Sequence, residues 1–354
     1  MIEIDGSQKS GSGTIVRDAV SLSILTGQEL YLKNIRARRD KPGLRPQHLK
    51  GVEACSQICQ GKLEGAKVGS REIRFWPGGK ISGGNFNFDI GTAGSTTMLA
   101  SILLPLSLFA ERASTYTITG GLFQDFAPSA YHLKYVLFPV LKEMGVDADF
   151  EIIQPGYVPR GAGVIGIKIR PQREQLRPIV LLEQGKITEI KGVALSSLLK
   201  ERRVSERMAK ECQKGLKAKG YSPRIEIVYD VKEEPAFPKV SIQAGASLAI
   251  WAKTDTGSLI GSDMAGELRR AAEFIGKQVA RNLIEDLESV ATVDRHLADQ
   301  LIPFCALADG VSEYLIPQMT EHVETRLWLV EKILGAETEV RNNRVIIRGV
   351  GYWR

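Results

Sequence analysis

The stretch NFNFDIGTAGSTTMLASILLPLSLFA, residues 85–110, decides the fold class of this 354-residue chain. Residues 85–90 alternate polar and apolar side chains, which is typical of a strand with one buried face. The glycine-rich turn at residues 91–95 then opens an apolar segment that is long enough to be a helix. A strand, a tight turn and a helix in this order predict a mixed α/β protein, in which helices pack on a sheet.

The same pattern occurs three times, in about residues 1–80, 81–176 and 277–354. Each copy has roughly the order strand, helix, strand, helix, strand, strand (βαβαββ), and the third copy begins with its first helix. Apolar side chains recur with a period near 3.6 in the helices and near 2 in the strands. The expected strands lie at residues 2–4, 29–35, 62–68 and 72–75, at 85–90, 115–119, 147–153 and 164–169, and at 311–316, 337–341 and 344–348. The expected helices lie at residues 15–25, 46–60, 91–110, 129–144, 294–308 and 320–334.

A block with a different pattern, residues 177–276, separates the second copy from the third. It predicts strands at residues 186–194, 224–229 and 247–254 and a long basic helix at residues 196–219. We therefore expect a fold of the α/β (α+β) class. Three βαβαββ repeats form a large domain, residues 1–176 and 277–354, and residues 177–276 form a small α/β domain inserted between repeats two and three.

The composition, with 43% apolar and 25% charged residues, is that of a soluble globular protein. The net charge of +6 is compatible with a nucleic-acid or nucleotide partner without establishing one. The longest apolar run, residues 98–110, is too short to cross a membrane, and the N-terminus lacks the pattern of an export signal. The four cysteines form no CxxC pair and have no histidine nearby, which disfavours zinc. We expect a cytoplasmic protein with buried or half-buried thiols and no membrane partner.

A basic segment, RARRDKPGLRPQHL at residues 36–49, is the first candidate for a binding site. It places five cationic side chains beside a Pro-Gly turn and continues into Gln47 and His48. Guanidinium groups bind phosphate oxygens in pairs, and a turn before a helix start offers backbone N–H groups. The segment therefore predicts a phosphate site, and the plainer alternative is a solvated basic loop.

His322 is the candidate for a nucleophile. Thr320 can cap a helix, which would put His322 in its first turn. The positive end of the helix dipole disfavours a protonated imidazole, and the same end suits a bound triphosphate. A neutral imidazole that attacks an α-phosphorus gives a covalent nucleotidyl phosphoramidate. A capping or surface histidine is the plainer alternative.

Three further segments could contact a nucleotide. The helix start His296-Leu297-Ala298-Asp299-Gln300 offers a ring, a carboxylate and an amide, although it could equally be an ordinary capped helix. Residues 5–13, DGSQKSGSG, and residues 91–95, GTAGS, are glycine-rich turns before helices and could cradle a phosphate. The first is not a P-loop, and either could be a flexible turn. Arg17 lies one turn into the helix after the first loop and could reach the same anion.

Taken together, these segments resemble the RNA 3′-terminal phosphate cyclase family. The shared motifs follow one another along nearly the whole chain, which makes them more specific than any one alone. They include DGSQ with GSG and Arg17 at residues 5–17, IRARRDKPGLRPQHL at 35–49, GTAGS at 91–95, HLADQL at 296–301 and ALADGVS at 306–312, followed by His322. The resemblance implies three βαβαββ repeats with an α/β insert between the second and the third.

The resemblance also implies an ATP-dependent reaction on an RNA 3′-phosphate end. ATP adenylylates a histidine, the AMP passes to the RNA 3′-phosphate as an anhydride, and the vicinal 2′-hydroxyl closes a 2′,3′-cyclic phosphate. His322 matches the nucleophile of the family, and residues 296–300 match its adenosine-binding segment. The positions that match its nucleotide and phosphate site are Arg17, Arg39, Gln47 and His48. The oligomeric state stays open, with a homodimer among the options.

Three positions depart from the family pattern. A glutamate thought to help hold the metal is replaced by Ser10, which follows Lys9, so the site of the expected divalent metal (Mg or Mn) is unknown. A glutamine in the helix after GTAGS, at the nucleotide site, is replaced by Ser101. A Thr-Asp pair is replaced by Leu122-Phe123. Lys9 could supply charge that a metal otherwise would.

Two other functions remain as alternatives. A non-catalytic or divergent cyclase-like protein that binds or processes RNA would share the fold, and such relatives lack the nucleophilic histidine. His322 favours the enzyme, whereas Ser10 and Ser101 favour the binding protein. A transferase acting on a small phosphorylated metabolite is the third candidate, because βαβαββ repeats also occur in enolpyruvyl transferases, but the collinear motifs favour it least.

Overall fold

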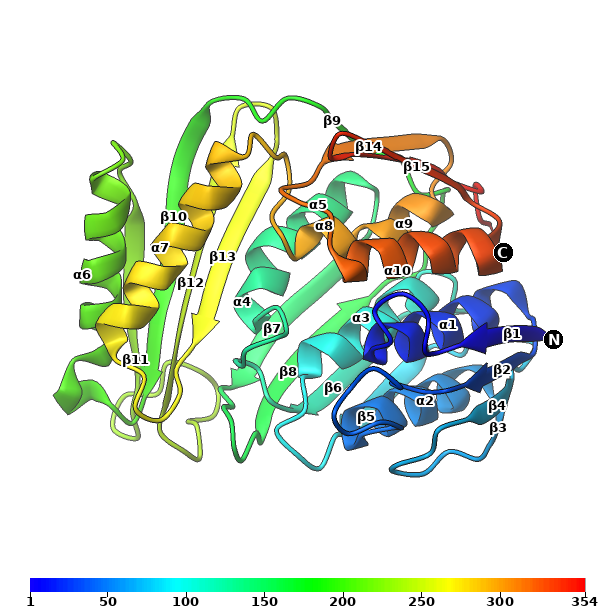
Figure 1. Ribbon diagram of the computed structural model, residues 1–354. Helices are drawn as coiled ribbons and strands as arrows, with labels where there is room; N and C mark the ends of the chain where they lie inside the picture. The colour runs from blue at the N-terminus through cyan, green and yellow to red at the C-terminus, as the bar shows by residue number, and fades with distance from the viewer. Residues whose placement is uncertain (354) are drawn as a thin grey trace.

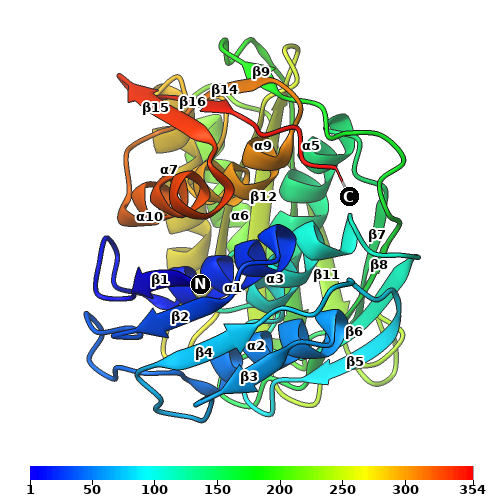
Figure 2. The ribbon, with the colours of Figure 1, turned by 90° about the vertical axis from the view of Figure 1, so that its right-hand side faces the viewer.

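The computed structural model of the protein describes residues 1–353, in which sixteen strands form four four-stranded sheets. Three of the sheets surround a group of helices (Figure 2). The fourth sheet and two long helices lie to one side of this group (Figure 1). The α/β class expected from the sequence is confirmed.

The first two sheets are built alike. The first has the strand order β1 (Ile2–Asp5), β2 (Leu30–Lys33), β4 (Ile73–Trp76), β3 (Lys62–Glu64), and its helices are α1 (Gly13–Thr26) and α2 (Pro46–Cys59). The second has the order β5 (Gly84–Asp89), β6 (Ser114–Gly120), β8 (Gly163–Ile169), β7 (Ala148–Gln154). Its helices are α3 (Thr96–Ser107) and the continuous segment α4 (Ala130–His132), η1 (Leu133–Leu137) and α5 (Phe138–Glu143). In each sheet the first pair is parallel and the others are antiparallel. The strand and helix expected in residues 85–110 are confirmed as β5 and α3.

The third sheet has the order β9 (Val180–Leu181), β14 (Val311–Leu315), β16 (Arg344–Arg348), β15 (Glu337–Arg341). Its helices are α8 (Leu297–Gln300), α9 (Ile302–Leu307), α10 (Glu321–Leu329) and the turn η3 (Val330–Leu334) that continues α10. The single helix expected at residues 294–308 is therefore wrong. Pro303 lacks a backbone N–H and sits in the first turn of α9, where a second helix starts.

The fourth sheet has the order β11 (Arg224–Asp230), β10 (Ile187–Ser197), β12 (Gly245–Thr254), β13 (Leu259–Ala265). Its helices are η2 (Lys200–Arg202), α6 (Val204–Lys217) and α7 (Ala272–Glu288). The helix expected from residue 196 starts too early, because Ser196 and Ser197 still pair with strands on both sides. Leu198 and Arg203 then adopt left-handed backbone conformations, which separate the strand from α6.

We propose new limits for the inserted unit, whose expected range of residues 177–276 stays a prediction. β9 pairs in parallel with β14, so it belongs to the third sheet. α7 crosses residue 276 and buries Ile275, Val279 and Leu283 in the same apolar cluster as Met208 of α6. On these contacts the unit extends from about residue 186 to about residue 290.

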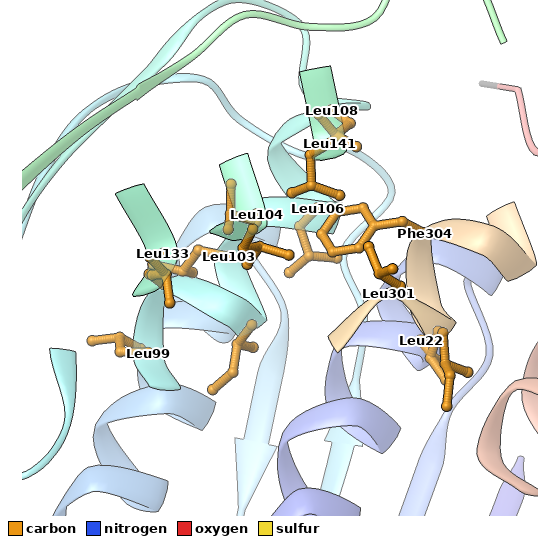
Figure 3. Packing of buried hydrophobic residues seen from close by; sticks show 14 of the residues in the cluster. Leu22, Leu99, Leu103, Leu104, Leu106, Leu108, Leu133, Leu141, Leu301 and Phe304 are labelled. Atoms are coloured by element: carbon orange, nitrogen blue, oxygen red, sulfur yellow. The ribbon is translucent and has the colours of Figure 1, made fainter. Parts of the chain in front are cut away.

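α3 lies at the centre of the apolar core and explains why the helices hold fixed positions. Figure 3 shows its leucines packed against Leu22 of α1, Leu133 of η1 and Phe304 of α9. Each such leucine is almost completely buried, which stabilises the fold by about 2 kcal/mol relative to an exposed side chain. All four cysteines are buried as expected, and burial raises the pKa of Cys212 and of Cys305 to about 12. Within residues 1–353, no helix is both long and apolar enough to cross a membrane.

Candidate functional site

A cleft of about 570 Å³ lies where four helices begin. Three of these helices have a side-chain cap: Ser12 on α1, Ser95 on α3 and Thr320 on α10. The fourth, α2, begins with Pro46 directly before two cleft residues, Gln47 and His48. The N-termini of helices carry partial positive charge and backbone N–H groups without helical partners. Four of them at one cleft form a site suited to an anion with several phosphates.

The structure brings most of the predicted site residues together in this cleft. The first 50 residues contribute Arg17, Arg39, Gln47 and His48. Later segments contribute Ser101, His296, Asp299, Gln300 and His322. Leu297 and Ala298 do not line the cleft, because their side chains are buried in the apolar core. The basic segment and His322 thus share one cleft, although more than 270 positions separate them in the sequence.

His322 lies in the first turn of α10, as expected. The Thr320 hydroxyl accepts a hydrogen bond from the Val323 N–H at 3.2 Å and so caps the helix. The ring Nδ1 is 3.0 Å from Oγ1 of Thr14, which holds the ring against the start of α1. Partial burial lowers the pKa of His322, and the charges of Arg17 and Arg326 lower it further against the attraction of Asp299. The imidazole is therefore neutral at pH 7.

Two buried arginines face the same region. Arg17 donates from Nη2 to Oγ1 of Thr14 at 3.1 Å, while its Nε has no partner among the described residues. Burial lowers the pKa of Arg17 to about 10, so the side chain stays charged at pH 7. Arg326 forms ion pairs with Asp18 at 2.8 Å and with Asp299 at 3.4 Å. Arg17 thus keeps an unused donor for an anion, whereas the charge of Arg326 is largely matched within the protein.

His48 packs against the glycine loop at the wall of the cleft. It is 4% exposed, and its Nδ1 accepts a hydrogen bond from the Arg45 N–H at 3.2 Å. Burial, together with the charges of Arg17, Arg36 and Arg45, lowers its pKa to about 2, so the ring is neutral. A Cβ atom on Gly13 would lie 2.1 Å from the His48 Nε2, so only glycine fits there. His48 is therefore a packing partner of the glycine loop.

Only part of the basic segment reaches the cleft. Arg36 and Arg39 line it, whereas Arg38, Lys41 and Arg45 do not. Arg36 also donates from Nη1 to the carbonyls of Lys41 and Gly43, at 2.6 and 2.9 Å, which closes the loop on itself. Phosphate binding by this segment stays a prediction, and Arg36 and Arg39 are the arginines of the segment that line the cleft.

The positions that depart from the family pattern have separate environments. Ser10 is buried, and its Oγ lies 2.9 Å from Oγ of Ser12 and accepts from the Thr325 hydroxyl at 2.9 Å. Lys9 does not line the cleft, and a role in place of a metal stays a hypothesis. Ser101 lines the cleft and donates to the Met98 carbonyl at 2.8 Å. Leu122 and Phe123 lie in the apolar core.

The cleft does not fit a metal centre built by the protein alone. Among residues 1–353, no three His, Cys, Asp or Glu side chains gather where they could hold a metal ion. The carboxylates at the cleft are Asp125 and Asp299, and each is ion-paired with an arginine. The polar groups that line the cleft are therefore mainly guanidinium groups and hydroxyls, which suit an anion better than a metal ion.

Behind His296 lies a buried ion pair that the sequence did not suggest. His132 of α4 places Nε2 at 3.1 and 3.0 Å from the two carboxylate oxygens of Asp294. The same carboxylate accepts from the N–H groups of His296 and Leu297, each at 2.8 Å, and of Gly261 at 2.8 Å. Burial lowers the pKa of His132, but the Asp294 charge outweighs it and raises the pKa overall. The pair thus joins α4, β13 and the 296–300 segment.

Sequence reasoning also missed Thr14, Arg326, Asp125 and Phe126, all of which line the cleft. Arg326 could have been found, because it follows His322 by four positions and so lies on the same helix face. Thr14 follows the glycine loop directly. Asp125 and Phe126 carry no local signal, since their position depends on contacts with distant segments.

Comparison with known proteins places these residues in a family context. Residues 8–340 match the family described as RNA 3′-terminal phosphate cyclase. The RNA 3′-terminal phosphate cyclase of Archaeoglobus fulgidus is 38% identical over 98% of this chain and 100% of its own length. That of Methanopyrus kandleri is 35% identical over 96% of this chain and 95% of its own length. That of Pyrobaculum aerophilum is 34% identical over 100% and 99%, respectively.

Proposed function

Because this chain belongs to the RNA 3′-terminal phosphate cyclase family, we propose that it uses ATP to convert an RNA 3′-terminal phosphate into a 2′,3′-cyclic phosphate. The observation that carries the proposal is the neutral histidine, His322, in a cleft where four helix N-termini and Arg17 favour a triphosphate. Family membership supports the overall reaction, and this geometry supports its first chemical step.

In the first step, the imidazole of His322 attacks the α-phosphorus of ATP. A nitrogen–phosphorus bond forms, the bond from that phosphorus to the bridging oxygen breaks, and pyrophosphate leaves with the electron pair. In the tautomer with the proton on Nδ1, this N–H donates a hydrogen bond to Oγ1 of Thr14, 3.0 Å away. The lone pair of Nε2 is then left for the attack. The product is an adenylyl-histidine.

In the second and third steps, the AMP group moves and is then released. An oxygen of the RNA 3′-phosphate attacks the same phosphorus, displaces the histidine and forms an anhydride with AMP. The vicinal 2′-hydroxyl then attacks the 3′-phosphorus, loses its proton to solvent and expels AMP, which closes the ring. Negative charge on phosphate oxygens is present throughout, and Arg17, Arg36 and Arg39 line the cleft where they can stabilise it.

Two buried polar atoms support ATP as the nucleotide. The Arg17 Nε is a donor without a partner among the described residues, and a phosphate oxygen can satisfy it. The Gln300 Oε1 is a buried acceptor that also has no partner among the described residues, and the amino group of adenine can donate a hydrogen bond to it. In this arrangement Asp299 and the His296 ring are left for the ribose and the face of the base.

The test is product formation from an RNA oligonucleotide that carries a radioactive 3′-terminal phosphate. With ATP and either Mg²⁺ or Mn²⁺, the wild-type protein should make the label resistant to phosphatase, because a cyclic diester is not a monoester. His322→Asn should make no product, whereas Glu321→Gln, next to it in the chain and outside the cleft, should retain activity. Absence of ATP-dependent product from folded wild-type protein would overturn the proposal and favour a divergent RNA-binding protein.

A further inference from the structure

An exposed aromatic side chain stands at the edge of the cleft. Phe126 lines the cleft, and its side chain is fully exposed. Its backbone has a φ of +64°, in the left-handed region that phenylalanine rarely adopts. The loop therefore holds an apolar ring in water through a conformation that the residue itself disfavours. Such a conformation persists only where neighbouring contacts impose it.

Those contacts come from the inserted unit. Arg270 donates from Nη1 and Nη2 to the two carboxylate oxygens of Asp125, at 3.0 and 2.7 Å, directly before Phe126. Asp263 of β13 accepts from the Ser129 N–H at 2.9 Å on the other side of the loop. A bidentate arginine–carboxylate pair fixes both position and orientation. The Phe126 loop is thus tied down at both ends, so its ring is presented in a defined place.

A second groove of about 580 Å³ lies on the other side of the Asp125–Arg270 pair. Its apolar lining includes Val158 and Leu268, which are 55% and 89% exposed. Arg270 also lines this groove, while Asp125 lines the cleft, so the two hollows share a wall. Single exposed apolar side chains are common, but here they gather beside one cleft.

The groove has an excess of positive charge. Four arginines line it, against one acidic side chain, Glu267. Arg207 and Arg270 are ion-paired with Glu273 and Asp125. Arg202 and Arg269 are exposed, and neither has an acidic partner among the described residues. Unpaired guanidinium groups beside apolar surface match a ligand that alternates phosphates with flat rings, which is single-stranded nucleic acid.

We propose that Phe126 stacks on the terminal base of the RNA and that the preceding nucleotides lie in this groove, with Arg202 and Arg269 at their phosphates. The inference rests on the proposed function, because it places the strand whose 3′-phosphate enters the cleft. Stacking on an aromatic ring tolerates every base, so the site is expected to bind RNA 3′ ends with little sequence preference.

The experiment measures RNA binding by fluorescence anisotropy without ATP. The probe is a fluorescein-labelled single-stranded RNA with a 3′-phosphate, used beside the same RNA with an abasic terminal nucleotide. Phe126→Ala should weaken binding of the intact RNA roughly tenfold and leave binding of the abasic RNA unchanged. Phe126→Trp should bind the intact RNA at least as well as the wild type does. Arg269→Ala should weaken binding of both RNAs and lower the salt dependence.

The matched control is Arg173→Ala, an exposed arginine that lines neither hollow and should bind as the wild type does. Equal binding by Phe126→Ala and wild type, or an equal loss on intact and abasic RNA, would overturn the proposal. The proposal would also be overturned if the wild-type protein forms cyclic phosphate and Arg269→Ala binds both RNAs as tightly as the wild type does. Self-labelling by ATP alone tests the proposed chemistry separately, so failure of one can be told from failure of the other.

Discussion

At the residue scale, the cleft keeps two histidines neutral in different ways. His48 is deeply buried, which lowers its pKa to about 2 and fixes it as a packing partner. His322 is exposed to the cleft, and its pKa is lowered by partial burial together with the nearby arginines. A buried neutral ring can support a loop, whereas an accessible neutral ring can act as a nucleophile. Burial and access, rather than residue type, separate the two roles.

Gly13→Ala should disrupt the site through His48. The added methyl group would lie 2.1 Å from Nε2, so the glycine loop or the ring must move. We expect a loss of stability of about 1–3 kcal/mol, measured by urea unfolding, and a loss of cyclase activity. Gly79→Ala is the control, because nothing lies within 4 Å of its Cβ position. Wild-type stability and activity in Gly13→Ala would contradict the packing role given to His48.

Thr14→Val should slow the reaction without abolishing ATP binding. The substitution keeps the shape of the side chain and removes the hydroxyl that contacts Nδ1 of His322 and Nη2 of Arg17. We expect histidine adenylylation to slow by about 10–100-fold, because the ring loses its orienting partner. Thr14→Ser should restore most of the rate in single-turnover labelling. A serine variant as slow as the valine variant would show that the hydroxyl is not what matters.

At the element scale, the proposed site is formed by the first turns of four helices that meet at the cleft. α1, α2, α3 and α10 come from distant parts of the chain, yet all begin at one cleft. Each start is visible in the sequence, through Ser12, Pro46, Ser95 and Thr320. Their convergence is not visible, because it follows from how sheets and helices pack around α3. Figure 1 shows α10 alongside α1, which brings His322 to Thr14.

Thr320→Ala should destabilise the start of α10. The Thr320 hydroxyl accepts from the Val323 N–H at 3.2 Å, and loss of such a cap costs about 1 kcal/mol. We expect that loss in urea unfolding, together with weaker ATP-dependent labelling, because His322 lies two residues further on. Thr320→Ser should behave as the wild type does. An alanine variant with unchanged stability would mean that the first turn is held by other contacts.

The sequence was a good guide to elements and a partial guide to the site. Regular alternation located β5, helical spacing located α10, and an apolar run of sufficient length located α3, which is buried almost all round. The same reasoning failed at residues 294–308, where Pro303 splits the helix, and missed β13 and α7. Within the site, the motifs led to Arg17 and His322. They did not separate the cleft residues Asp299 and Gln300 from Leu297 and Ala298, whose side chains are in the apolar core. The direction in which each of these side chains points depends on the tertiary fold.

At the scale of the whole molecule, the inserted unit contacts the proposed site at two places, the loop that carries Phe126 and the carboxylate behind His296. Arg270 holds the loop that carries Phe126, and Gly261 of β13 donates to the Asp294 carboxylate behind His296. Figure 1 shows this unit beside the body that the other three sheets form. Its proposed role is therefore to brace the cleft and to extend it as a groove for RNA.

The His132–Asp294 pair should give stability a measurable pH dependence. The pKa of His132 is raised in the folded protein, so its contribution is complete below its ordinary pKa and is lost as pH rises through the folded value. As the pH rises above about 6.5, the free energy of unfolding should fall more in the wild type than in His132→Gln. At low pH the variant should be less stable by roughly 3 kcal/mol. Equal pH slopes in chemical unfolding would show that the pair does not titrate in this range.

The most direct test of the central claim is self-labelling with ATP that carries a radioactive α-phosphate, with and without divalent metal. The wild-type protein should form an adduct that is labile to acid and stable to alkali, as expected of a phosphoramidate, and peptide mapping should place it on His322. His322→Asn should form none, and Glu321→Gln should label as the wild type does. An adduct on another residue, or no adduct under any metal condition from folded wild-type protein, would contradict the nucleophilic role of His322.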